Sequence, residues 1–198
     1  MAALDKTINI EPYALTIPEV TSMTPEKYPA VLRLLHWLMA IAVLGMIGSG
    51  WYMASLSQDV SYKYDIYPWH KSFGILVLIL VAVRILVRLF TKTPPMPKGL
   101  PNHEKVLAKL THFSLYALMI LVPLSGFTMS DAGGHDVFFF GIQLPELMEN
   151  NKELAGILHT VHTYIPYVFL AIIALHILGA LKHRFMDKPE NDVLSRMI

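Results

Sequence analysis

The chain has 198 residues, of which 54% are hydrophobic and only 16% are charged. This composition, with a mean hydropathy of +0.47, is more apolar than that of a soluble domain of similar length and predicts a membrane protein. The absence of cysteine excludes disulfides, thiolate-bound zinc, iron–sulfur clusters and covalently attached haem. No nucleic-acid partner is expected. The net charge of +1 carries little information by itself, because in a membrane protein the informative quantity is the number of lysines and arginines on each side of the membrane.

Four apolar segments follow a polar N-terminal stretch. Residues 1–29 contain four prolines and lack the basic start and small-residue cleavage site of a signal peptide, so we expect a retained cytoplasmic extension. Each apolar segment reaches the roughly 20 residues that a transmembrane helix needs. We expect spans over about residues 31–53, 69–90, 106–129 and 155–182. They predict an all-α membrane protein, an antiparallel four-transmembrane-helix bundle over residues 30–186, with a cytoplasmic tail over residues 187–198.

The connections between the spans differ in character. The segment TKTPPMPKGLPN after the second span contains four prolines and predicts a stiff extended linker. The apolar segment VFFFGIQL between the third and fourth spans is too short to cross a bilayer, so we expect a cap on the membrane face. His103 and His135 are expected in loops.

The basic residues predict an orientation. Thirteen of the 16 lysines and arginines lie on the side that carries the N-terminal part, the Pro-rich linker and the C-terminal tail. Cytoplasmic segments carry an excess of lysine and arginine, so we expect both termini to face the cytoplasm. An even number of spans agrees with this, and we expect a multi-pass membrane protein.

Histidines on the fourth span give the first indication of chemistry. His162 and His176 are 14 residues apart, which on a helix separates them by about 21 Å and leaves them within about 40° of the same face. A single intramembrane histidine is more often a packing residue than a ligand. Three on one stripe, counting His183, are harder to explain in this way because ionisable groups in hydrocarbon are costly and usually functional. The spacing suits two stacked b haems, one in each half of the membrane.

The same 14-residue spacing on the other spans defines two layers of residues. The outer layer contains Gly50, His70, Gly126 and His162, and the inner layer contains His36, Arg84, His112 and His176. Two histidines in the outer layer suffice for one bis-histidine haem. The two glycines either leave room for a porphyrin face or, together with Gly45 and Gly48, serve helix packing.

The inner layer has more histidines than one haem needs. His176 requires one partner, and both His36 and His112 lie at a suitable depth. Arg84 in the same layer can pair with haem propionates or a quinone oxygen. The surplus histidines, including His183 nearer the surface, either hold a quinone head group and pass protons or are hydrogen-bonded near the interface.

Several motifs together resemble the bacterial cytochrome b561 family of di-haem membrane cytochromes b, which includes superoxide oxidase. They are RLLHWLMA, WHKSFGILVLILVAVRILVRLF, the TPP of the linker, THFSLYALMILVPLSGF, FFFGIQLP and the H-x13-H-x6-H pattern of the last span. The resemblance covers about Ala30 to Met186, and the long N-terminal segment departs from the short members of the family. It implies a quinone-reactive electron carrier of the bacterial inner membrane with two non-covalent b haems.

The resemblance also implies a role for each histidine. His36 and His176 would bind the cytoplasmic-side haem. His70 and His162 would bind the periplasmic-side haem. The surplus histidines His112 and His183 would lie beside ubiquinone.

Two functions remain open. One is an oxidoreductase that moves electrons from a periplasmic one-electron donor such as superoxide to ubiquinone. The other is a cytochrome b subunit that anchors a dehydrogenase or joins a larger respiratory complex, with residues 1–29 as a docking arm. Seven carboxylates against three lysines on the outer connections disfavour an anionic substrate, although Lys71 beside His70 provides a local positive charge. A non-redox scaffold leaves the histidine layers unexplained.

Overall fold

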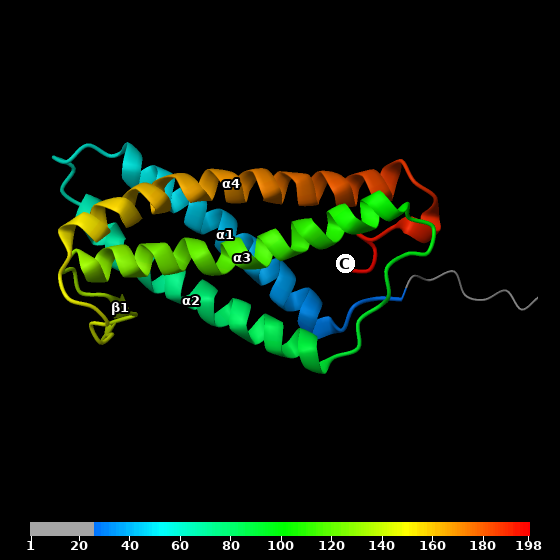
Figure 1. The fold of residues 1–198 in the computed structure, drawn as a ribbon, viewed down its shortest axis with the longest axis horizontal. Helices are drawn as coiled ribbons and strands as arrows, with labels where there is room; N and C mark the ends of the chain where they lie inside the picture. Colours follow the sequence, from blue (N-terminus) through cyan, green and yellow to red (C-terminus); the bar gives the residue numbers. More distant parts are fainter. Residues whose placement is uncertain (1–25) are drawn as a thin grey trace, which may run out of the picture.

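The computed structural model describes residues 26–198, so most of the predicted N-terminal extension lies outside the described residues. Four long helices run antiparallel in a bundle (Figure 1). They are α1 (Ala30–Ser55), α2 (Lys63–Phe90), α3 (Asn102–Ala132) and α4 (Lys152–Phe185). All four are long and apolar enough to cross a membrane. The predicted four-span bundle is therefore confirmed.

The helices extend beyond the apolar segments at both ends of the bundle. Helix α2 begins at Lys63, six residues before the predicted span, because the polar turn that precedes Trp69 continues the same helix. Helix α3 begins directly after Pro101, so His103 lies in its first turn rather than in a loop as predicted. Hydropathy marks where a helix enters hydrocarbon, whereas the backbone hydrogen bonds that define the helix continue into the aqueous layer.

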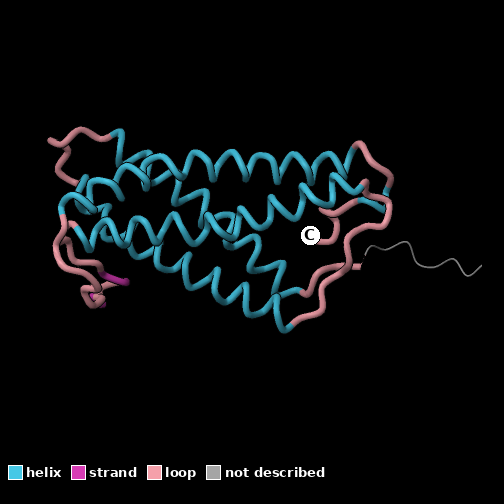
Figure 2. The backbone as a smooth tube through the Cα atoms, viewed as in Figure 1, coloured by secondary structure: helices cyan, strands magenta, loops and turns pink. Residues whose placement is uncertain are grey.

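A short hairpin lies beside α2 at the end of the bundle where α2 and α4 begin, which we call the outer end (Figure 2). Its strands are β1 (Phe138–Phe139) and β2 (Ile142–Gln143), which pair antiparallel within the apolar segment predicted to form a cap. Ser72 of α2 fastens the hairpin, because its hydroxyl lies 2.9 Å from the Phe138 carbonyl oxygen and accepts a hydrogen bond from the Phe140 amide at 3.0 Å. The cap segment thus packs against α2.

The buried core is an apolar layer halfway along the bundle. It consists of Val43, Ile47, Val77, Leu118 and Phe169, with at least one residue from each helix. Val43, Val77 and Phe169 each lie seven residues from the inner-layer and the outer-layer position of their own helix. The core therefore separates the two predicted layers of histidines with a layer of hydrocarbon side chains.

The C-terminal tail, residues 187–198, folds back across the end of the bundle at which α1 and α3 begin (Figure 1). The Trp37 indole donates a hydrogen bond to the main-chain oxygen of Met197 at 2.9 Å. Arg33 Nη1 donates to the main-chain oxygen of Ile198 at 2.7 Å. The tail is therefore part of the folded bundle, and we call this end the inner end.

Candidate functional site

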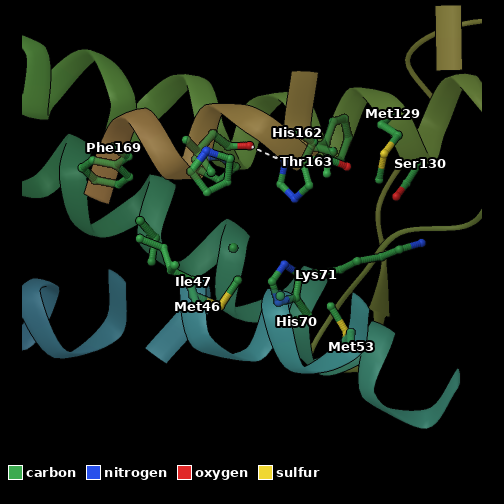
Figure 3. A pocket seen from close by; sticks show the side chains of 18 of the residues that line it. Met46, Ile47, Met53, His70, Lys71, Met129, Ser130, His162, Thr163 and Phe169 are labelled. Atoms are coloured by element: carbon green, nitrogen blue, oxygen red, sulfur yellow. Dashed lines mark hydrogen bonds between the residues drawn. The ribbon is translucent and has the colours of Figure 1, made fainter. Parts of the chain in front are cut away.

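The outer pair consists of His70 on α2 and His162 on α4, whose rings face each other across a cavity (Figure 3). Their ring centroids are 6.3 Å apart and their planes make an angle of 84°. An imidazole nitrogen binds a transition metal at about 2.0 Å, so two rings on opposite sides of one ion have centroids about 6 Å apart. The spacing of the outer pair therefore fits two axial ligands of one metal ion.

Hydrogen bonds determine which ring nitrogen of each outer histidine is available to bind a metal ion. His70 Nδ1 lies 2.9 Å from the Ser49 hydroxyl, which donates its own proton to a main-chain oxygen of α1. His162 Nδ1 lies 3.0 Å from the Ser125 hydroxyl and 3.0 Å from the main-chain oxygen of Val122. Because each hydroxyl proton is already donated, Nδ1 carries the ring proton and Nε2 keeps a free lone pair. This arrangement is typical of metal-binding histidines.

The two outer-layer glycines lie directly beside these rings. A Cβ atom on Gly126 would lie 2.7 Å from His162 Cε1, and one on Gly50 would lie 3.5 Å from His70 Cε1. No described atom outside the local helix backbone lies within 4 Å of such a Cβ on Gly45 or Gly48. The glycines at positions 50 and 126 therefore make room at the histidines, and close helix packing accounts for neither Gly45 nor Gly48.

A cavity of ≈ 280 Å³ surrounds the outer pair and is lined by residues of all four helices. Its lining is mainly apolar and includes methionines such as Met46 and Met129, together with Lys71 at one edge (Figure 3). A largely apolar cavity with two convergent imidazoles suits a large flat cofactor held by axial ligands and packing.

Three histidines meet at the inner layer. The centroids of His36 and His176 are 6.0 Å apart with an interplanar angle of 63°. Those of His112 and His176 are only 5.2 Å apart. The first distance fits two ligands across one metal ion, whereas the second is about 1 Å shorter than that geometry requires. His112 Nδ1 lies 2.6 Å from the main-chain oxygen of Ala108 on its own helix. The geometry therefore favours His36 over His112 as the partner of His176.

A family model described as prokaryotic cytochrome b561 matches residues 27–198. The chain belongs to the prokaryotic cytochrome b561 family. Cytochrome b561 homolog 2 of Escherichia coli (strain K12) is 32% identical over 177 residues, which cover 88% of this chain and 93% of that protein. Probable superoxide oxidase CybB of Yersinia pestis is 31% identical over 177 residues, which cover 87% of this chain and 96% of that protein.

Membership in the cytochrome b561 family establishes the class of protein and the type of cofactor. The chain is a membrane cytochrome b that functions in electron transfer, and b-type haem is its cofactor. The free Nε2 atoms and ring spacing of the outer pair, together with its apolar cavity, fit a non-covalent haem. The predicted family resemblance is confirmed.

Arg84 lies in the same layer as the inner histidines of this cytochrome b561, where it contacts two neighbouring helices. Its Nη1 donates to the main-chain oxygen of Leu32 at 2.7 Å, and its Nε donates to the Tyr116 hydroxyl at 3.2 Å. These bonds join α2 to α1 and α3. Arg84 therefore has a fixed position in the inner layer, where its charge is available to a neighbouring anion.

His183 lies seven residues beyond His176, at the inner end of α4. Its Nδ1 lies 2.7 Å from Asp187 Oδ2. This hydrogen bond is the largest effect on the pKa of Asp187 and holds it below its ordinary value; burial opposes the shift, and the charge of Lys182 adds to it. His183 is thus held by a carboxylate and does not join the inner histidine cluster. His135 lies in the outer loop as predicted, and His159 on α4 lines the outer cavity.

The sequence reasoning missed the side chains that hold the histidines. Ser49 and Ser125 directly precede the outer-layer glycines, so α1 and α3 both carry the pattern His-x12-Ser-Gly. This repeat was visible in the sequence and would have identified both serines. The carboxylate of Glu104 lies near His183, but no comparable repeat in the sequence marks this residue.

Proposed function

We propose that this cytochrome b561 transfers electrons across the bacterial inner membrane, between a one-electron donor at the outer side and ubiquinone at the inner side. The observation that carries the proposal is the presence of two histidine pairs at the spacing of axial ligands, 6.3 Å in the outer layer and 6.0 Å in the inner layer. Two such pairs on opposite sides of the apolar core support the proposal of two redox centres on one path across the membrane.

In this proposal His70 and His162 hold the outer b haem, and His36 and His176 hold the inner one. Each haem supplies one-electron redox chemistry, whose potential depends on axial ligands, hydrogen bonding and burial. The helices keep the paired imidazoles opposed, and Ser49 orients the His70 ring. The apolar core layer excludes water between the two centres.

The inner end offers groups for ubiquinone. His112 and His183 are the two inner histidines that the haem assignment leaves unused, and Arg84 lies in the same layer. Neutral imidazole can donate a hydrogen bond to a quinone oxygen, and imidazolium can supply a proton. We therefore assign the quinone head group to this end of the bundle, near His112 and His183, with Arg84 facing either a haem propionate or the quinone.

Superoxide is the outer donor that we favour, because a relative of similar length carries the name probable superoxide oxidase. The outer connections of this chain are acidic overall, which disfavours an anion. However, Lys71 lines the outer cavity next to His70. Lys71 Nζ donates to the main-chain oxygen of Asp136 at 3.1 Å, which holds its charge at the rim. A local positive charge at this point can guide a small anion to the outer site.

The test is anaerobic mixing of purified, ubiquinone-loaded protein with superoxide. We expect fast reduction of the haem absorption bands followed by ubiquinol in a yield of one molecule for each two electrons supplied. Lys71→Gln should slow the first phase and make it less sensitive to salt. Haem bands that stay oxidised in superoxide would exclude this donor.

The acidic outer face favours a second candidate, a cytochrome b subunit that accepts electrons from a partner protein within a larger respiratory complex. Residues 1–29 would then serve as a docking segment. Failure of superoxide to reduce the haem, together with copurification of a dehydrogenase that requires residues 1–29, would select this second function.

A further inference from the structure

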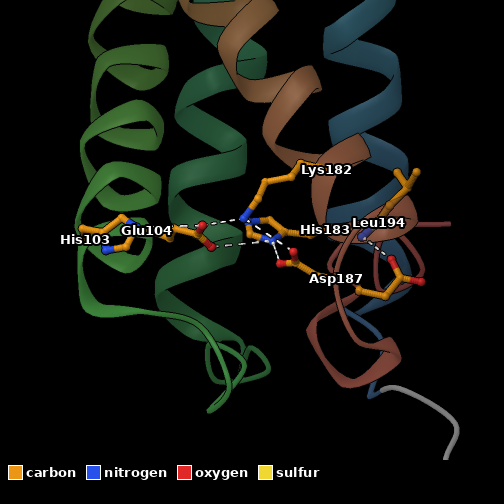
Figure 4. Close-up of polar contacts among 7 residues, drawn as sticks. His103, Glu104, Lys182, His183, Asp187 and Leu194 are labelled. Carbon is orange, nitrogen blue, oxygen red and sulfur yellow. Dashed lines mark hydrogen bonds and ion pairs between the residues drawn. The ribbon is translucent and has the colours of Figure 1, made fainter.

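His183 lies between two carboxylates at the inner end of the bundle, one from α3 and one from the segment after α4 (Figure 4). Its Nδ1 is 2.7 Å from Asp187 Oδ2 and 3.9 Å from Glu104 Oε2. One ring nitrogen of His183 and one oxygen of each carboxylate all lie within 4.8 Å of one another. The side chains of His183, Asp187 and Glu104 are 13%, 17% and 19% exposed. The three groups therefore converge on one small, largely buried space.

Lys182 pairs with the other oxygen of each carboxylate. Its Nζ forms an ion pair with Glu104 Oε1 and lies 3.5 Å from Asp187 Oδ1. The oxygens nearest His183 Nδ1 are Oε2 and Oδ2, so they are not the ones that the ammonium group holds. Two carboxylates and one ammonium group leave one negative charge on the cluster when the imidazole is neutral. This charge attracts a further cation.

Glu104 Oε2 is an acceptor that lacks a donor. The atom is buried and has no hydrogen-bond partner among residues 26–198. A buried polar atom without a partner is rare in a folded protein, and a bound ion is one of its ordinary explanations. Its distance of 3.9 Å from His183 Nδ1 is too long for a hydrogen bond. A cation placed between the two atoms would satisfy both.

The distances around Nδ1 suit a zinc ion. Zinc binds imidazole nitrogen and carboxylate oxygen at about 2.0–2.2 Å, so ligand atoms at two corners of a tetrahedron are about 3.4 Å apart. The distances of 2.7 Å to Asp187 and 3.9 Å to Glu104 lie on either side of that value, and each reaches it by a movement of less than about 1 Å. An imidazole ligand favours zinc over Mg²⁺, which prefers oxygen ligands in octahedral geometry.

We propose that Glu104, His183 and Asp187 form a Zn²⁺ site that joins the first turn of α3 to the end of α4. His183 binds through Nδ1, and its ring proton moves to Nε2 through solvent. Glu104 Oε2 and Asp187 Oδ2 supply two anionic ligands, and water completes the tetrahedral shell. Lys182 stays on the other two oxygens and orients both carboxylates, as hydrogen-bond partners of metal ligands commonly do.

Bound zinc would also control the quinone end of the molecule. This consequence, unlike the metal site itself, rests on the proposed function, which assigns His183 to ubiquinone. A zinc-bound imidazole cannot become imidazolium and therefore cannot supply a proton to a quinone oxygen. We expect zinc at this site to inhibit ubiquinone reduction.

The test is zinc binding to the detergent-solubilised holoprotein by equilibrium dialysis, with bound metal counted by atomic absorption. Glu104→Gln and Asp187→Asn each remove one anionic ligand. Loss of an outer-shell partner alone costs about 10–100-fold in metal affinity, so each variant should bind zinc at least about 10-fold more weakly than the wild type. Glu190→Gln removes an exposed carboxylate at the same end of the bundle and should bind zinc as the wild type does. Excess Mg²⁺ should not displace the zinc.

Unchanged zinc affinity in both Glu104→Gln and Asp187→Asn would overturn the site. X-ray absorption at the zinc edge of the wild-type protein gives a second measurement that needs no variant to fold. One imidazole and oxygen ligands are expected, and a shell with two or more imidazoles would place the metal elsewhere and also overturn the proposal.

Reoxidation of reduced haem by a short-chain ubiquinone separates the metal site from the quinone assignment. Zinc should slow reoxidation of the wild type by about 10-fold or more, and the same zinc concentration should have less effect on Glu104→Gln. Zinc that binds as expected without slowing the wild type would support the metal site and contradict the assignment of His183 to ubiquinone.

Discussion

Replacing Gly126 by alanine tests the outer histidine pair most sharply. The added Cβ would lie 2.7 Å from His162 Cε1 and 3.1 Å from both ring nitrogens. Carbon atoms pack best at about 3.5–4.0 Å, so the ring must withdraw by about 0.8 Å or more. That movement disturbs the hydrogen bonds of Nδ1, which lie at 3.0 Å, and the 6.3 Å spacing to His70.

The cost of such overpacking is about 1–3 kcal/mol. If the whole cost falls on cofactor binding, the outer haem binds about 5- to 150-fold more weakly, since about 1.4 kcal/mol corresponds to a factor of ten. The assay is transfer of haem from the purified protein to excess apomyoglobin, followed by absorbance. Gly126→Ala should lose one haem at least several-fold faster than the wild type and should retain the other.

Matched alanine substitutions on α1 provide the control. At Gly50 the new Cβ meets His70 at an ordinary contact distance of 3.5 Å, and at Gly48 it meets no described atom outside the local helix backbone within 4 Å. The expected order of haem loss is therefore Gly126→Ala fastest, then Gly50→Ala, with Gly48→Ala equal to the wild type. Equal haem retention in all three variants would refute the assignment of the outer pair.

Three further predictions, made on five substitutions, separate the remaining roles. His36→Ala should remove the inner haem, whereas His112→Ala should retain both haems. The absorption spectrum of each purified variant tests this, and the reverse pattern would make His112 the ligand. His112→Ala and His183→Ala should each keep both haems but lose most ubiquinone reduction, so that the haems stay reduced after electrons are supplied from outside. Ubiquinone turnover at the wild-type rate in both variants would show that the two histidines are only packing residues near the membrane interface. Ser49→Ala should shift the midpoint potential of the outer haem more than Ser125→Ala, because the main-chain oxygen of Val122 still holds the other ring. Equal shifts in a redox titration would contradict this assignment of the hydrogen bonds.

The sequence predicted the spans and the juxtaposition of the histidines for a simple geometric reason. Fourteen residues make nearly four turns of helix, so a fixed spacing on antiparallel helices places residues in two layers without knowledge of the loops. The contacts of His70 with His162 and of His36 with His176 follow from this regularity. Fourteen-residue spacing could not choose between His36 and His112, because both lie at the same depth and only the rotation of the helices distinguishes them.

Other features depend on parts of the chain that lack such periodicity. Glu104 meets His183 only because α3 begins directly after Pro101 and α4 extends to Phe185, two boundaries that hydropathy does not define. Asp187 reaches the same imidazole because the chain turns directly after α4. Contacts of this kind depend on helix ends and the turns after them, where polar side chains carry no repeating pattern.

The number of haems per chain tests the two-layer account most directly. Acidified acetone should extract all the haem, because the chain has no cysteine for covalent attachment. A pyridine haemochrome assay on the purified protein, with the chain quantified by amino-acid analysis, should then give a ratio near two. A ratio near one would contradict the account, because one of the two histidine pairs would then have no cofactor to hold.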